Sequence, residues 1–244
     1  MVIFLSFIIP FYGLLIKKIN FISFILIWLI GFIIFNYLSI IPYLALITVL
    51  GFAFISDMLN KSKKDLLRDY KDILSNVSVS FIAVLLYLYF KDNRFIVIYY
   101  ATLAGILSDV LAGSFGTLSK GKPVNMFTFK KAEKGTSGAI SLLGLYLSLV
   151  GGVIIALIFS LEHFNLKYFI LISLSGLLGS IMDSSLGALV EVKYKCTVCN
   201  QETEEKYHCN QKGTIIKGYY FINNNAVNLL SNIIVFLVCL LVLI

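Results

Sequence analysis

Aspartates and asparagines inside apolar stretches are the residues of this sequence best suited to chemistry. Asp183 lies within SLSGLLGSIMDSSLGALVEV (173–192), Asp109 lies in a second such run, and a third run opens with FINNNAVNLLSN (221–232). An ionised side chain near the centre of a bilayer costs several kcal/mol unless it faces protein, water or a partner. Carboxylate and amide oxygens are ligands that Mg²⁺ accepts, so these runs predict a polar site between membrane helices.

The composition defines the class of protein that must position these residues. The 244-residue chain is 59% hydrophobic and 14% charged, and its mean hydropathy is +0.92, which is typical of an integral membrane protein. Because one helical crossing needs about 20 apolar residues, we predict an all-α, polytopic helical bundle formed by a single transmembrane domain, 1–244. Its eight crossings are expected at 2–16, 19–35, 37–59, 73–90, 95–113, 138–160, 166–190 and 223–244, or seven if the short first segment is not a full crossing.

The basic residues predict how the bundle is oriented. Of the 20 lysines and arginines, 17 fall in alternate loops: the loop after the first segment and three long basic loops at 60–72, 114–137 and 191–222. Lysine and arginine accumulate on the cytoplasmic side, so we expect a multi-pass protein of the cell membrane with both termini outside and these loops in the cytoplasm. Orientation alone explains the net charge of +7, and an added anion-binding role is the alternative. No nucleic-acid partner is expected, and the oligomeric state is open.

Small and polar residues recur at steps of three and four in four segments, which places them on one face of each helix. They are Thr102, Gly105, Asp109, Ala112 and Gly116; Gly138, Ser141, Gly144 and Ser148; Gly176, Ser180, Asp183, Gly187 and Glu191; and Asn225, Asn228 and Asn232. Close helix packing explains the glycines and serines. It does not explain two aspartates and a cluster of asparagines.

Depth along the helices brings these polar residues to one side of the membrane. At 1.5 Å per residue, Asp183 lies about 10 Å and Asp109 roughly 6 Å from the cytoplasmic ends of their predicted segments. The sequence therefore predicts a carboxylate-lined pocket beneath lysine-rich loops. A metal-bound polyphosphate suits both features, since carboxylates hold Mg²⁺ and lysines neutralise phosphate oxygens. A buried aspartate paired with a lysine is the alternative.

Two glycine clusters could bind phosphate. The first, GTLSKGK (116–122), is one residue short of the Walker pattern, but a membrane helix precedes it and Pro123 replaces the hydroxyl residue, so we exclude a P-loop fold. Its glycines still permit close backbone approach beside Lys120 and Lys122. The second cluster (135–138) opens the predicted sixth segment, where helix amides favour an anion.

These stretches match known membrane families. In order along the chain, ATLAGILSDVLAGSFG, KGTSGAISLLG, GLLGSIMDSSLGALVEV and FINNNAVNLLS resemble the family that includes plant phytyl-phosphate kinase. The resemblance begins near residue 65, where LLRDYKDILSNV is similar to that family's RDxxQVLANG, and it ends at the family's DNDxVN. SDVLAGSFGTLSKGK and KKAEKGTSG are more distantly similar to dolichol kinases, and the first also to CTP-dependent phosphatidate cytidylyltransferases.

The resemblance implies a Mg²⁺-dependent phosphotransferase of the kind used in phytol salvage. A nucleoside triphosphate, with CTP favoured, would phosphorylate phytyl, geranylgeranyl or farnesyl phosphate to the prenyl diphosphate. Asp109 and Asp183 would bind Mg²⁺, and Asn225 and Asn228 would contact metal or phosphate. Further nucleotide or phosphate contacts would come from Arg68, Asn76, Lys120, Lys122, Lys131, Gly135, Thr136, Ser141, Ser184 and Asn224.

The sequence departs from the family patterns at several positions, and other activities are therefore alternatives. Ser114 stands in place of Glu, Glu191 in place of Gln, and Asn223 and Asn225 in place of Asp. The alternatives are a CTP-dependent lipid-phosphate cytidylyltransferase, a polyprenol kinase, and a transporter of an anionic lipid or solute.

The loop 191–222 contains a candidate zinc site. Cys196-x2-Cys199 is followed by the adjacent pair His208-Cys209. A Cys₃His site would stabilise a loop too short to have a core of its own. Strain between adjacent His and Cys ligands makes three cysteines with another fourth ligand an alternative, and free thiols are a further one. A disulfide is disfavoured in a cytoplasmic loop.

Overall fold

The described part of the chain contains eight α-helices. The computed structural model describes residues 2–59, 67–119, 121–127, 130–131 and 138–244, with side chains from Ser6 onward. The helices are α1 (Val2–Leu15), α2 (Phe21–Tyr37), α3 (Ile40–Leu59), α4 (Tyr70–Phe90), α5 (Asn93–Phe115), α6 (Leu142–Ser160), α7 (Leu166–Leu189) and α8 (Asn224–Leu243). Among the described residues, six helices, α3 to α8, are long and apolar enough to cross a membrane, whereas α1 and α2 are shorter. The prediction of a polytopic helical membrane protein is confirmed.

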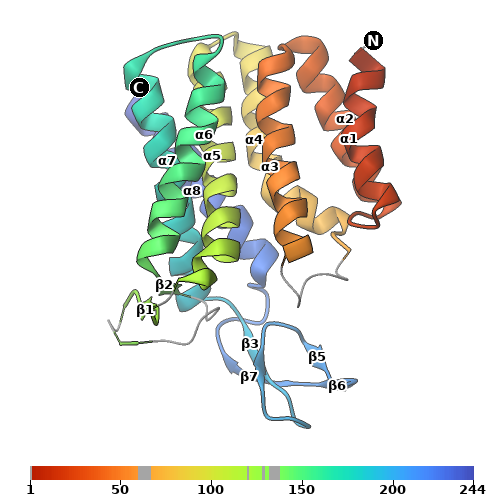
Figure 1. The fold of residues 1–244 in the computed structure, drawn as a ribbon, viewed down its shortest axis with the longest axis vertical. Helices are drawn as coiled ribbons and strands as arrows, with labels where there is room; N and C mark the ends of the chain where they lie inside the picture. Colours follow the sequence, from red (N-terminus) through yellow and green to blue (C-terminus); the bar gives the residue numbers. More distant parts are fainter. Residues whose placement is uncertain (1, 60–66, 120, 128–129, 132–137) are drawn as a thin grey trace.

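Helix α5 is the centre of the bundle. It contacts α3, α4, α6, α7 and α8, and every residue from Ile96 to Ser108 is buried. Small residues of α5, such as Ala101, Ala104 and Gly105, allow the neighbouring helices to pack closely around it. Helices α1 and α2 lie at the periphery, beside α3 and α4 (Figure 1).

Polar residues between the apolar segments determine where helices begin. The Asp69 side chain accepts hydrogen bonds from two amides of the first turn of α4, while Asp72 accepts one from the Asp69 amide, which makes a capping box. Asn165 and Asn223 cap α7 and α8 in the same manner. These caps determine where α4 and α8 begin. The two helices are also in contact with each other.

The sixth helix begins later than the sequence predicted. Gly138 has a φ of +78°, which a helix excludes, and residues 139–140 form strand β2 (Ala139–Ile140), paired with β1 (Val124–Asn125). The hydroxyl of Ser141 then accepts from the amide of Gly144 and caps α6. The predicted helix start at 138 is therefore wrong, because α6 begins at Leu142. Gly135 and Thr136 lie outside the described residues, so the anion site expected there stays a prediction.

Small residues bring α5, α6 and α7 into backbone contact. A Cβ on Gly176 would lie 2.6 Å from the Cα of Gly152, and one on Gly151 would lie 2.7 Å from the Cα of Ser108. The hydroxyl of Ser148 donates to that of Ser180 at 2.9 Å. In these three helices the small residues act as packing residues.

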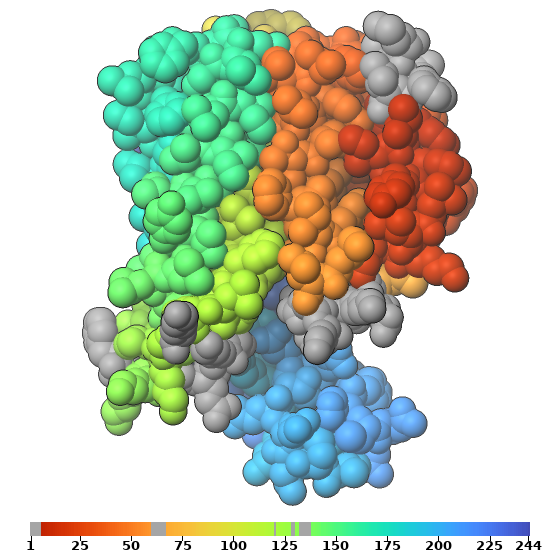
Figure 2. Space-filling model, viewed as in Figure 1, coloured from red at the N-terminus to blue at the C-terminus, as the bar shows by residue number. Residues whose placement is uncertain are grey.

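The segment 191–222 folds as a small β lobe. Strand β3 (Lys193–Lys195) pairs with β4 (Glu202–Thr203) and β7 (Thr214–Lys217), and β5 (Tyr207–His208) pairs with β6 (Gln211–Lys212). Figure 2 shows this lobe in blue, projecting beneath the helices. The lobe and the β1–β2 hairpin lie at one end of the bundle, and both termini lie at the other (Figure 1).

Candidate functional site

A small polar cavity of about 10 Å³ lies between four helices. Its lining comes from α4, α5, α7 and α8 and consists of Asn76, Gly105, Ile106, Asp109, Gly179, Asp183, Asn228, Ser231 and Asn232. Four residues that the sequence singled out, from four different helices, thus meet at one place: Asn76, Asp109, Asp183 and Asn228.

Two glycines bring the aspartates together. A Cβ on Gly179 of α7 would lie 2.5 Å from the Cα of Gly105 of α5, so the two backbones touch at this crossing. Asp109 and Asp183 each follow their glycine by four residues, which is about one helical turn on the same face. Both α5 and α7 run towards the end of the bundle that carries the β lobe (Figure 1). The carboxylates consequently lie on the same side of the crossing.

The cavity lies close to one end of the helix bundle. Asp109 and Asp183 precede the ends of their helices by six residues each, about 9 Å at 1.5 Å per residue. Asp109 is deeper than the sequence predicted, because α5 continues to Phe115. Asn76 and Asn228 lie in the second turns of α4 and α8, which begin at the same end.

The electrostatics of the cavity favour a cation. Its lining contains two carboxylates and no lysine or arginine among the described residues. Ser231 Oγ lies 3.4 Å from Asp183 Oδ2, and it donates to the Asn228 carbonyl at 2.9 Å. Like charges in a medium of low dielectric constant repel strongly, and a bound cation relieves that repulsion.

Hydrogen bonds between α4 and α8 frame the cavity. Asn232 Nδ2 donates to the Asn76 carbonyl at 3.1 Å, and Asn225 Nδ2 donates to Asp72 Oδ1 at 2.9 Å. Asn225, an expected metal or phosphate contact, therefore joins α8 to α4 and does not line the cavity. Asp72 was not foreseen as part of the site, although its spacing with Asn76 placed both on one helical face.

The same pair explains one departure from the family patterns. Asp72 stands where RDxxQVLANG has Gln, and Asn225 stands where DNDxVN has Asp. The family patterns and this chain each have one amide and one carboxylate at these two positions, but in the opposite order. The hydrogen bond between α4 and α8 needs one of each, so the loss of the acid at Asn225 is matched by its gain at Asp72.

Arg68 makes an ion pair away from the cavity. Its Nε and Nη2 donate to Asp57 Oδ2 and Oδ1 at 2.7 and 3.1 Å. Asp57 is buried near the end of α3, and its role was not predicted. Arg68, expected to contact nucleotide or phosphate, therefore holds α3 against the start of α4.

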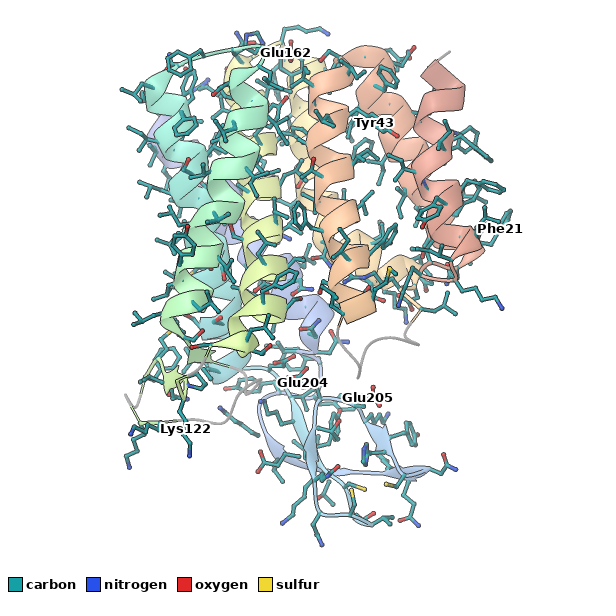
Figure 3. All side chains as sticks on the ribbon, in the orientation of Figure 1. Phe21, Tyr43, Lys122, Glu162, Glu204 and Glu205 are labelled. Carbon is teal, nitrogen blue, oxygen red and sulfur yellow. The ribbon has the colours of Figure 1, made fainter. Side chains whose placement is uncertain are left out.

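The remaining expected contacts that the structure describes do not line the cavity. Lys122 and Lys131 are exposed beside β1, Asn224 is exposed at the start of α8, and Ser184 is half-buried next to Asp183. Ser141 Oγ donates to the Gly116 carbonyl at 3.1 Å, which joins α6 to the end of α5. Lys120 lies outside the described residues. Figure 3 shows Lys122, Glu204 and Glu205 at the end of the bundle nearest the cavity.

Three cysteines and a histidine of the β lobe form a second cluster. The ligand atoms of Cys196, Cys199, His208 and Cys209 all lie within 4.8 Å of one another, an arrangement that could bind a metal such as zinc. His208 and its neighbour Cys209 both belong to the cluster, despite the strain expected between adjacent ligands. His208 Nδ1 lies 3.4 Å from Cys199 Sγ and 3.3 Å from Cys209 Sγ. Hydrogen bonds from the Cys199 amide, the His208 side chain and the Val198 amide lower the pKa of Cys196 to about 6.

Comparison with known proteins identifies the family. The profile of the family described as integral membrane protein DUF92 matches residues 4–236, and the chain belongs to that family. It is similar to an uncharacterized membrane protein, MJ0933, of Methanocaldococcus jannaschii, with 31% identity over 160 residues, 65% of this chain and 63% of that protein. It is also similar to Protein PGR of Arabidopsis thaliana, with 32% identity over 135 residues, 50% of this chain and 46% of that protein. The chain thus spans from about half to less than two thirds of these relatives' lengths. No solved structure matches it.

Proposed function

We propose that this DUF92 protein is a membrane prenyl-phosphate kinase, which transfers a phosphoryl group from a nucleoside triphosphate, CTP by preference, to a prenyl monophosphate. The observation that carries the proposal is the convergence of Asp109 and Asp183 on one cavity, directly beyond the contact between Gly105 and Gly179. The ordered sequence stretches that resemble the family of phytyl-phosphate kinase supply the substrate class.

The donor atoms of the cavity suit Mg²⁺. Carboxylate, amide and hydroxyl oxygens line it, and hard oxygen donors are what Mg²⁺ prefers. Asp109 and Asp183 would hold the ion, with Asn228 and Ser231 beside them. When bound, Mg²⁺ neutralises the charge that develops on the transferred phosphoryl group.

The size of the cavity limits what it holds. Small-molecule sites usually measure about 300 to 1,000 Å³, so a cavity of about 10 Å³ takes at most a single ion or water molecule. The nucleotide itself would lie at the end of the bundle, where the lysines of the β1–β2 hairpin are exposed. Lys122 and Lys131 would neutralise phosphate oxygens there.

Phosphoryl transfer depends more on the positioning of the two substrates than on acid–base catalysis. An oxygen of the prenyl monophosphate, already ionised at neutral pH, attacks the γ-phosphorus; the bond to the bridging oxygen breaks, and the nucleoside diphosphate leaves. The prenyl tail partitions into lipid at about 0.8 kcal/mol per CH₂ group, which keeps the acceptor phosphate at the membrane surface. A cavity about 9 Å from the helix ends is within reach of that phosphate.

A matrix of nucleotides and acceptors tests the proposal. Purified protein in detergent with Mg²⁺ is incubated with CTP, ATP, GTP or UTP and with phytyl, geranylgeranyl or farnesyl phosphate, a polyprenol, or phosphatidate. The expected products are a prenyl diphosphate and a nucleoside diphosphate, absent from the double variant Asp109→Asn/Asp183→Asn. Release of pyrophosphate would instead indicate cytidylyl transfer, and no product in any combination would refute the proposal. Uptake of an anionic substrate into liposomes without nucleotide would identify a transporter.

A further inference from the structure

We infer that Cys196, Cys199, His208 and Cys209 bind a structural Zn²⁺ that holds the β lobe together and anchors it between α7 and α8. The site lies outside the cavity, takes no part in phosphoryl transfer, and does not depend on the proposed function. Three thiolates and one imidazole are a closed tetrahedral set of the kind that structural zinc sites use.

The ligands lie on two turns that approach each other from different hairpins. In the first turn, between β3 and β4, the Asn200 amide donates to the Cys196 carbonyl at 3.0 Å and the Val198 amide donates to Cys196 Sγ at 3.4 Å. In the second turn, between β5 and β6, Cys209 has a φ of +50°. Because the four ligand atoms all lie within 4.8 Å of one another, one ion would join both hairpins.

The lobe lacks an apolar core that could replace the ion. Its large apolar side chains are mostly exposed: Val198, Tyr207, Ile215, Ile216, Tyr219, Tyr220 and Phe221. Within 191–222 the buried apolar side chains are Val192, Tyr194 and Cys196, and Cys196 is itself a ligand. Units below about 40 residues usually need a metal or a disulfide to fold, so the observed strand pairing calls for such a crosslink.

A disulfide accounts for the cluster less well than a metal does. It would join two sulfurs at about 2.05 Å and leave the third cysteine and the histidine without a role. All three cluster cysteines are free thiols in the structure, and the histidine nitrogen lies within 3.4 Å of two of them. Binding of Zn²⁺ as three thiolates releases thiol protons to solvent and changes no oxidation state.

The ion would influence the cavity through the root of the lobe, the place where residues 190–192 and 219–222 join it to α7 and α8. The lobe joins α7, which carries Asp183, to α8, which carries Asn228. At its root the Val192 amide donates to the Ile222 carbonyl at 2.8 Å, and the Tyr219 amide donates to the Val190 carbonyl at 3.1 Å. A folded lobe therefore fixes the separation of the two helix ends.

Metal analysis of the full chain tests the inference directly. The chain has four cysteines and two histidines, so Cys239 and His163 provide matched controls outside the cluster. Protein purified in detergent without chelators is expected to contain about one zinc ion per chain, as are Cys239→Ser and His163→Gln. Cys199→Ser and His208→Gln are expected to lose most of it. Undiminished zinc in these two variants, iron in place of zinc, or a disulfide between cluster cysteines would overturn the assignment.

Chelation of the wild-type protein avoids any dependence on variant folding. Removal of zinc is expected to open the lobe to trypsin at Lys206 and Lys212, while the helical circular dichroism of the bundle stays the same. Added Co²⁺ should restore protection and give a thiolate-to-cobalt absorption band, which Cys199→Ser should lack. An unchanged cleavage pattern after complete zinc removal would refute the structural role. None of these measurements involves a nucleotide, so their failure is separate from failure of the kinase proposal.

Discussion

Gly179 on α7 packs so tightly on Gly105 of α5 that a Cβ at position 179 would stand 2.5 Å from the Cα of Gly105. The contact lies one turn from both cavity aspartates, since each glycine precedes its aspartate by four residues. A side chain at position 179 must separate α5 from α7. The separation of the two carboxylates therefore depends on the absence of a side chain at Gly179.

Gly179→Ala is expected to reduce turnover at least about tenfold and to destabilise the protein by about 1 to 3 kcal/mol, because the added methyl group overpacks the crossing. Initial rates and the fraction of monodisperse protein after heating in detergent measure both effects. Gly113→Ala, in the same α5, is the control, since no described atom lies within 4 Å of its added Cβ. Wild-type rate and stability in Gly179→Ala would show that the helices adjust without cost.

The cavity aspartates are expected to be required for turnover. Asp109→Asn and Asp183→Asn keep the side-chain volume and remove one charge each, so each should lose at least about 100-fold in kcat while heat stability is kept. Removing one of two like charges also lowers their repulsion. Asp92→Asn is the control: Asp92 caps the opposite end of α5, and Asn caps equally well. Wild-type turnover in either cavity variant would exclude that residue from the site.

The exchanged pair Asp72 and Asn225 gives a test by double substitution. Asn225→Asp alone places two carboxylates where an amide now donates at 2.9 Å, so it should weaken the contact of α4 with α8 and lower both stability and turnover. Asp72→Gln combined with Asn225→Asp restores one amide and one carboxylate and should recover most of the loss. A double variant no better than Asn225→Asp would show that the two side chains do not act as a pair.

Local sequence signals predicted much of this structure. The eight apolar segments and the polar residues between them predicted the helices, and spacing by three and four placed Asp109 and Asp183 on the faces that meet. The late start of α6 was not predictable, because it follows from pairing of 139–140 with 124–125 across residues distant in sequence. The amide donors that join α8 to α4 likewise depend on which helices become neighbours.

The roles of Arg68 and Asp57 show the same limit in the candidate site. A resemblance to a family indicates which type of residue stands at a position, but not what that residue contacts. The guanidinium of Arg68 can bind either a phosphate or a carboxylate. Its partner is decided by the tertiary structure, in which the Asp57 side chain is 4% exposed and lies 2.7 Å from the guanidinium. Since Arg68 follows Asp57 by eleven positions and lies outside α3, neither spacing nor helical periodicity could indicate the pair.

The Arg68–Asp57 pair provides a prediction that separates a structural role from phosphate binding. Arg68→Gln leaves the buried Asp57 carboxylate without its ion pair and should destabilise the protein by about 3 to 5 kcal/mol. The double variant Arg68→Gln/Asp57→Asn has no buried charge at this place and can retain an amide–amide hydrogen bond. Its heat stability in detergent should therefore exceed that of Arg68→Gln.

Turnover of the same double variant decides between the two roles. If Arg68 acts only by holding α3 against α4, recovery of stability should bring recovery of kcat to within about fivefold of wild type, about 1 kcal/mol of activation free energy. If Arg68 also contacts a phosphate, the double variant will be stable yet slow, with a raised KM for the nucleotide or the acceptor. Because Nε and Nη2 of Arg68 both donate to Asp57, we expect the first result.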